Sequence, residues 1–155
     1  MIQRIQTLYL LLTTLLSGLF LSGNILSFID KSGARFFLKL SGFYSTSADK
    51  TDTLIRHLIP FTATGILILF CSVVAIFLFR KRNLQLKFSL TLIALLVALI
   101  LILTAYSVYF NKQFNVLPET GFKTILPLLS LFTAIMAYKG IRKDINLVDS
   151  IDRLR

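Results

Sequence analysis

Long apolar stretches, separated by short basic or polar segments, dominate the pattern of hydrophobic and polar positions along the chain. Four stretches cover residues 5–29, 58–79, 88–110 and 122–141. Each is long enough to cross about 30 Å of hydrocarbon at about 1.5 Å per helical residue. The pattern predicts an all-α integral membrane protein: a single transmembrane domain over residues 1–155, built as a bundle of four membrane-spanning helices.

The first stretch has a competing interpretation as a secretory signal peptide. Arg4 supplies a basic start, and Leu21-Ser22-Gly23 resembles a weak cleavage site. The uncharged stretch is longer than the apolar core of a typical signal peptide. Its length therefore favours a membrane span.

Small residues recur four positions apart in the first and fourth stretches. Such residues share one helical face and let a second helix approach closely. The candidates for helix packing are Thr14, Gly18 and Ser22 in the first stretch, and Ser130 with Ala134 in the fourth. The plainer explanation is that small residues are common in membrane helices.

The segment between the first two stretches is the longest polar part of the chain. Ala34 to Leu40 shows partial alternation of apolar and polar residues, which predicts a short strand or β-hairpin in the first outer loop. Asp49 or Thr51 is a candidate cap for a helix that leads into the second span.

Charge determines the predicted orientation. The chain has 17 Lys and Arg against 7 Asp and Glu, a net charge of +10. Ten of these cations lie near the N-terminus, the connection between spans two and three, and the tail, and seven are spread over the other side. The residues that determine topology are Arg80, Lys81, Arg82 and Lys87 in that connection. The positive-inside rule then predicts a multi-pass membrane protein with both termini in the cytoplasm.

The same cations do not predict nucleic-acid binding. They cluster at the ends of apolar runs, where attraction to lipid headgroups explains them, and form no basic stripe interleaved with aromatic residues. Membrane lipids are therefore the expected partners of these side chains.

The tail, residues 142–155, has apolar residues at helical spacing and predicts a cytoplasmic amphipathic helix. The candidate docking residues are Ile141, Ile145, Val148, Ile151 and Leu154. Their apolar face rests either on the headgroup boundary or the inner end of the bundle, or on a partner protein.

The two ends of the chain resemble a known family. Residues 1–12, Ile141-Arg142-Lys143-Asp144 and Asp152-Arg153-Leu154-Arg155 are similar to the bacterial family called domain of unknown function 4293. The resemblance covers the whole chain. It implies a small four-span protein of the inner membrane of Gram-negative bacteria, and no activity.

Little in the sequence predicts catalysis. All seven carboxylates lie outside the apolar runs. Proton-coupled transporters often have ionisable groups within the membrane, so this placement is evidence against that class of protein. Cys71 is the one cysteine and His57 the one histidine, so neither has a partner of its kind for a metal site. Asp52 and His57 could meet on the outer face, which is the main support for a lipid-modifying enzyme. We expect no enzymatic activity, no cofactor and no metal.

Two functions remain. The favoured one is a structural or accessory component that binds another membrane protein or itself as a homo-oligomer. The alternative is a passive carrier or channel for a small or lipidic molecule, which requires a polar cavity between spans. Its candidate lining residues are Thr62, Thr64, Ser72, Thr104 and Ser107.

Overall fold

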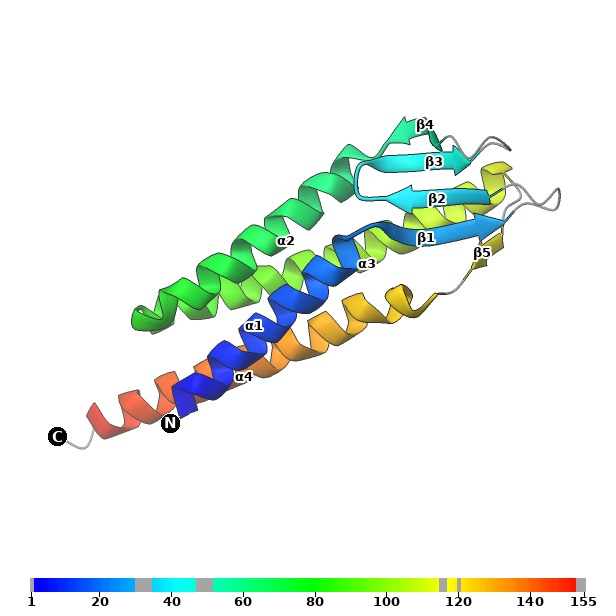
Figure 1. The fold of residues 1–155 in the computed structure, drawn as a ribbon. Helices are drawn as coiled ribbons and strands as arrows, with labels where there is room; N and C mark the ends of the chain where they lie inside the picture. The colour runs from blue at the N-terminus through cyan, green and yellow to red at the C-terminus, as the bar shows by residue number, and fades with distance from the viewer. Residues whose placement is uncertain (1, 30–34, 47–51, 115–116, 120, 153–155) are drawn as a thin grey trace.

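The computed structural model describes residues 2–29, 35–46, 52–114, 117–119 and 121–152. It is mostly helical, with a small sheet at one end (Figure 1). The long helices are α1 (Ile2–Leu21), α2 (Ile59–Phe77), α3 (Arg82–Phe114) and α4 (Leu126–Asp152). Two 3₁₀ turns, η1 (Leu78–Arg80) and η2 (Phe122–Ile125), precede α3 and α4.

The four helices run alternately up and down, so each packs against its neighbours in a ring. Helix α1 contacts α4 and α2, and α3 contacts α2 and α4. The start of α1, the η1 turn, the start of α3 and the end of α4 lie together, and we call this the basic end (Figure 1). The opposite end carries the sheet, and we call it the sheet end.

Each helix buries one face and exposes large apolar side chains on the other. Leu10, Ile68, Leu96 and Ala137 are buried in the core. Leu8, Phe70, Leu101 and Phe132 are exposed, one from each helix. Exposed apolar surface on every helix is what a bundle surrounded by lipid requires, and it would be unfavourable in water.

The sheet has five antiparallel strands in the order β4-β3-β2-β1-β5. The strands are β1 (Asn24–Ile29), β2 (Arg35–Lys39), β3 (Gly42–Thr46), β4 (Asp52–His57) and β5 (Leu117–Glu119). The all-α prediction is therefore wrong for this end of the molecule. The predicted hairpin corresponds to β2 and β3, but the sheet around it is larger. The helix expected to lead into the second span is also wrong over Asp52–His57, which form β4. Its candidate caps, Asp49 and Thr51, lie outside the described residues.

The apolar stretch 5–29 is not one helix. Gly23 adopts a positive φ of 66°, a left-handed conformation that ends α1. The Lys123 ammonium donates a hydrogen bond of 2.5 Å to the carbonyl oxygen of Ser22, where the helix dipole favours a cation. The chain then continues as β1, in which Ile25, Leu26 and Phe28 are buried. These buried apolar residues made the strand look like a continuation of the span.

Helix α3 extends beyond its apolar stretch and forms the support for the sheet. At about 1.5 Å per residue its 33 residues measure about 50 Å, well over the hydrocarbon thickness. Near its end, the ring of Phe110 stacks on Phe43 of β3 with centroids 3.9 Å apart. Phe28 of β1 meets Phe110 edge to face at 6.4 Å. This aromatic cluster attaches the sheet to the bundle.

The connection between α2 and α3 is shorter than predicted. Arg82 already begins α3, so residues 82–87 are helical instead of forming a loop. Gln85 explains part of this: its side chain is buried and donates a 3.1 Å hydrogen bond to the carbonyl oxygen of Ala75 in α2. The bond satisfies one carbonyl near the end of α2 and ties the two helices together.

The predicted tail is not a separate helix. Helix α4 continues without a break from Leu126 to Asp152. Ile141 is buried and Ile145 half-buried, so the first residues of the predicted docking face pack into the bundle. Val148 and Ile151 lie in the last turns of the helix, and Leu154 lies outside the described residues.

Candidate functional site

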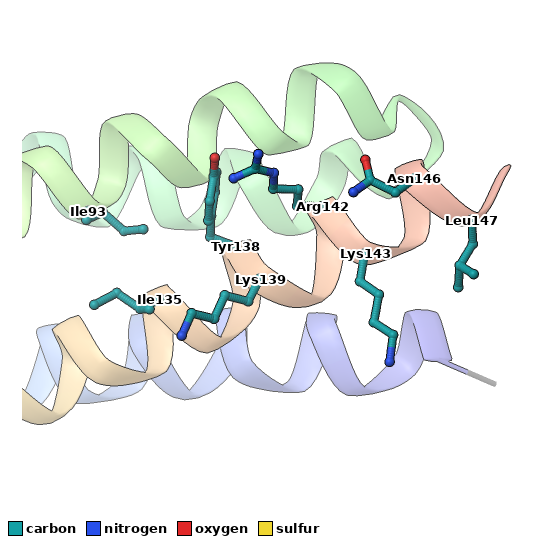
Figure 2. A pocket seen from close by; sticks show the side chains of 8 residues that line it. All are labelled: Ile93, Ile135, Tyr138, Lys139, Arg142, Lys143, Asn146 and Leu147. Atoms are coloured by element: carbon teal, nitrogen blue, oxygen red, sulfur yellow. The ribbon is translucent and has the colours of Figure 1, made fainter. Parts of the chain in front are cut away.

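The candidate site is a pocket of about 580 Å³ at the basic end, between α3 and α4. Figure 2 shows the eight side chains that line it. They are Ile93 of α3, and Ile135, Tyr138, Lys139, Arg142, Lys143, Asn146 and Leu147 of α4. Its volume lies within the range typical of small-molecule sites.

Helical periodicity explains why α4 supplies most of the pocket. The lining residues of α4 recur at spacings of three and four, so they form one stripe along the helix. Ala134, Ala137 and Ile141 are buried on a different face of the same helix. One face of α4 therefore builds the bundle, and another carries the polar and basic groups.

The site is strongly cationic. Within the described part of the chain, no ion pair involves Lys139, Arg142 or Lys143. The one carboxylate among the described side chains of α4 is Asp144, which is buried, whereas the three cations are exposed. In Figure 2, Tyr138 and Arg142 point from α4 to the same side, and Lys139 and Lys143 diverge from them. Three positive groups in one pocket favour an anionic ligand.

The pocket changes from apolar to basic along the helix axis. Ile93 and Ile135 lie at its inner end, and Arg142 lies seven residues beyond Ile135. Seven helical residues correspond to about 10 Å. The site thus combines apolar surface on the side of the bundle centre with cations on the side of the helix ends.

The predicted packing residues of α1 do not form its contact with α4. An added Cβ at Gly18 would meet none of the described atoms within 4 Å, and Ser22 is exposed. Thr14 donates to the carbonyl oxygen of Leu10 in its own helix. The contact face of α1 is shifted by one residue, since the buried side chains include Thr13 and Ser17.

On α4, by contrast, Ser130 and Ala134 are both buried. The hydroxyls of Thr13 and Thr133 lie 2.8 Å apart and form a hydrogen bond between α1 and α4. Near the basic end, an added Cβ at Gly140 would lie 3.0 Å from Cγ of Gln6. The two helices approach closely along this line.

The predicted topology residues gather at the basic end. Lys81 and Lys87 are exposed and Arg82 is half-buried, and Arg80 lies in η1. None of them lines the pocket of Figure 2. Arg82 and Lys87 lie in the first turns of α3, and Lys81 lies between η1 and α3.

Of the five hydroxyls proposed to line a channel, those of Thr62, Thr64, Ser72 and Thr104, but not that of Ser107, bond to backbone carbonyls in the described structure, mainly within their own helices. Thr64 donates to Pro60, Ser72 to Leu69, and Thr104 to Ile100 and Leu101. Thr62 donates to Leu58 and also to the carbonyl oxygen of Leu40, which anchors the β2–β3 turn on α2. These bonds use the groups that a polar pathway would need, so the structure gives the carrier no support.

At the sheet end, His57 lines a second pocket of about 590 Å³ together with Arg56, Tyr106 and Tyr109. The Arg56 guanidinium donates a 3.2 Å hydrogen bond to the hydroxyl of Tyr109. His57 is exposed, and the side chain of Asp52 lies outside the described ones. The described part of this pocket therefore has no acid beside the histidine.

The sequence predicted only that Lys139, Arg142 and Lys143 are basic residues at the end of a membrane span. The signal for a site was their spacing with Tyr138 and Asn146, which puts all five on one side of a helix. The placement of α3 beside them was not visible in the sequence.

The fold defines a mostly helical protein. In the described part of the chain, three helices are long and apolar enough to cross a membrane: Ile59–Phe77, Arg82–Gln113 and Phe122–Leu147. The apolar part of α1, Ile5–Leu21, is shorter. The model of the family described as "Domain of unknown function (DUF4293)" matches residues 2–154, so the chain belongs to this family and the resemblance of its two ends is confirmed. No curated protein matches the chain.

Proposed function

We propose that this protein is a multi-pass protein of the bacterial inner membrane that acts as a non-catalytic structural or accessory component. Four helices cross the bilayer, with the basic end in the cytoplasm and the sheet on the outer side. The protein binds another membrane protein, or a second copy of itself, through the sheet end.

The proposal that α1 is a fourth span is supported by its packing. Its apolar part covers Ile5–Leu21, at the lower limit of what can cross a bilayer. It lies alongside α4 and α2 within the ring of helices. A helix that exposes Leu8, Leu15 and Leu19 beside two membrane spans is most stable in the same lipid layer.

One observation carries the proposed binding role: the edge strand β4 exposes apolar side chains on both faces. Leu54 and Ile55 are 40% and 43% exposed, and in the described residues β4 pairs only with β3. The register shifts by one residue here, since Phe43 pairs with Arg56 and Tyr44 with Leu54. Such a bulge hinders continued strand pairing, so a partner would contact the side chains of β4 rather than extend the sheet.

The test is site-specific photocrosslinking in native membranes. A photoreactive residue at Leu54 should give a discrete crosslinked product, because a bound partner covers this position. The matched control is the same residue at Asn83, which is exposed at the basic end. A product of twice the mass of the chain indicates self-association, and a product of any other mass indicates a different partner.

Absence of a product from Leu54, together with a strictly monomeric protein after mild-detergent extraction, would count decisively against the proposal. Equal products from Leu54 and Asn83 would show random collision and would also refute a specific role for β4.

A further inference from the structure

We propose that the pocket of Figure 2 binds an anionic glycerophospholipid. Arg142 and Tyr138 hold the phosphate, Lys139 and Lys143 supply further positive charge, and an acyl chain lies against Ile93 and Ile135. This site is at the opposite end of the molecule from the proposed partner surface. The inference is independent of that partner, and needs only that the helices stand in a bilayer.

The polar half of the pocket fits a phosphate. A guanidinium offers a planar fork of donors that matches two phosphate oxygens, and the phenol of Tyr138 offers one more donor on the same side. Lys139, Arg142 and Lys143 have no carboxylate partner among the described side chains, so an anion would relieve their mutual repulsion.

The apolar half distinguishes a lipid from a soluble anion. Inorganic phosphate would leave the exposed parts of Ile93 and Ile135 uncovered. A glycerophospholipid places its phosphate at the headgroup level and its acyl chains toward the bilayer centre. The pocket matches this arrangement: its cations correspond to the phosphate and its apolar side chains to the acyl chain, about 10 Å apart along the helix.

The charge also selects among lipids. Phosphatidylcholine carries a quaternary ammonium group beyond its phosphate, and three cations without a carboxylate partner among the described side chains would repel it. Phosphatidylglycerol has the same phosphate with an uncharged glycerol, which Asn146 at the outer part of the pocket can bind by hydrogen bonds. The proposed ligand is therefore a lipid with net negative charge.

The experiment measures lipid binding to the full-length protein by native mass spectrometry from a mild detergent. Phosphatidylglycerol and phosphatidylcholine with identical acyl chains are titrated separately. The wild-type protein should bind one phosphatidylglycerol with clear preference over phosphatidylcholine. Removing cations with Arg142→Gln, and with Arg142→Gln plus Lys143→Gln, should weaken phosphatidylglycerol binding about five-fold for each charge, the scale for one cation at an anionic lipid surface.

The matched control is Lys112→Gln, which removes an exposed cation at the sheet end of α3 and should leave the preference unchanged. A second variant, Arg142→Lys, keeps the charge but loses the planar fork, and should bind with intermediate strength. Circular dichroism and the thermal midpoint without lipid identify any variant that fails to fold, in which case Arg142→Lys decides the question.

Three results would overturn the inference. The first is equal binding of the two lipids to the wild-type protein. The second is an equal loss of preference in Lys112→Gln and Arg142→Gln. The third is displacement of phosphatidylglycerol by inorganic phosphate at millimolar concentration, which would show a site for soluble anions.

Discussion

Gly18 of α1 and Gly65 of α2 lie on neighbouring helices but differ in the space around them: Gly65 is tightly packed and Gly18 is not. A Cβ added at Gly65 of α2 would lie 2.9 Å from Cδ2 of Leu21 and 3.1 Å from Cδ1 of Leu40. A Cβ added at Gly18 of α1 would meet no described atom within 4 Å beyond the backbone of its own helix. Alanine favours a helix over glycine by about 1 kcal/mol, so Gly18→Ala should keep or raise stability. Gly65→Ala should lower it by about 1–3 kcal/mol through overpacking.

Thermal unfolding in mild detergent, followed by circular dichroism, measures both variants. Equal shifts of the midpoint would contradict the packing described for α2, because both substitutions change helix propensity alike.

Two buried hydroxyls on α1 differ in their hydrogen bonds. The Ser17 hydroxyl has no partner among the described residues and borders a small internal space of about 10 Å³. The Thr13 hydroxyl bonds to Thr133 and to the carbonyl oxygen of Tyr9. Ser17→Ala removes an unsatisfied polar group and should not lower stability, whereas Thr13→Val should cost about 1 kcal/mol. The same unfolding measurement compares them, and a larger cost for Ser17→Ala would disprove this account of the α1–α4 contact.

At the scale of elements, the attachment of the sheet depends on one side chain. Phe110 is 1% exposed and contacts Phe28 and Phe43 from two different strands. Phe110→Ala should destabilise the protein by about 3–5 kcal/mol. Because the two rings that Phe110 supports belong to the sheet, backbone amides of β1 and β3 should exchange hydrogen faster, while the middle of α2 changes little.

The control for this variant is Val108→Ala on the same helix, at a side chain that is 55% exposed. Exchange of the β1 and β3 amides at the wild-type rate in Phe110→Ala would show that other contacts hold the sheet.

The helices were predictable because each must be apolar around most of its circumference, inside the ring and toward lipid alike. The sheet was not predictable, because its first strand is apolar as well: Ile25, Leu26 and Phe28 of β1 continue the apolar stretch of α1. Gly23 was the main sign in the sequence that the helix ends there. The continuity of α4 was obscured by Lys139 and Arg142, which resemble the end of a span. The pocket could not be predicted, because it requires Ile93 of α3 to lie beside α4, and a local sequence pattern does not show which helices are neighbours.

At the scale of the whole molecule, the proposed four-span arrangement predicts that the α2–α3 connection and the end of α3 lie on opposite sides of a bilayer. Asn83 and Lys112 are exposed near these two points. In a protein carrying Cys71→Ala, a cysteine introduced by Lys112→Cys should react in intact cells with a maleimide that cannot cross the inner membrane. A cysteine introduced by Asn83→Cys should react only after the membrane is permeabilised, because the positive-inside rule predicts that the cationic connection stays in the cytoplasm.

A third position checks that the bundle lies in lipid at all. Val73 is exposed near the middle of α2, and Val73→Cys should stay unlabelled under both conditions, because a thiol in hydrocarbon forms little of the reactive thiolate. Labelling of Val73→Cys under either condition would refute the assignment of α2 as a membrane span. Labelling of Asn83→Cys but not Lys112→Cys in intact cells would show that the orientation is the reverse of the predicted one. The lipid pocket would then face the outer side of the membrane, and the β4 surface the cytoplasm.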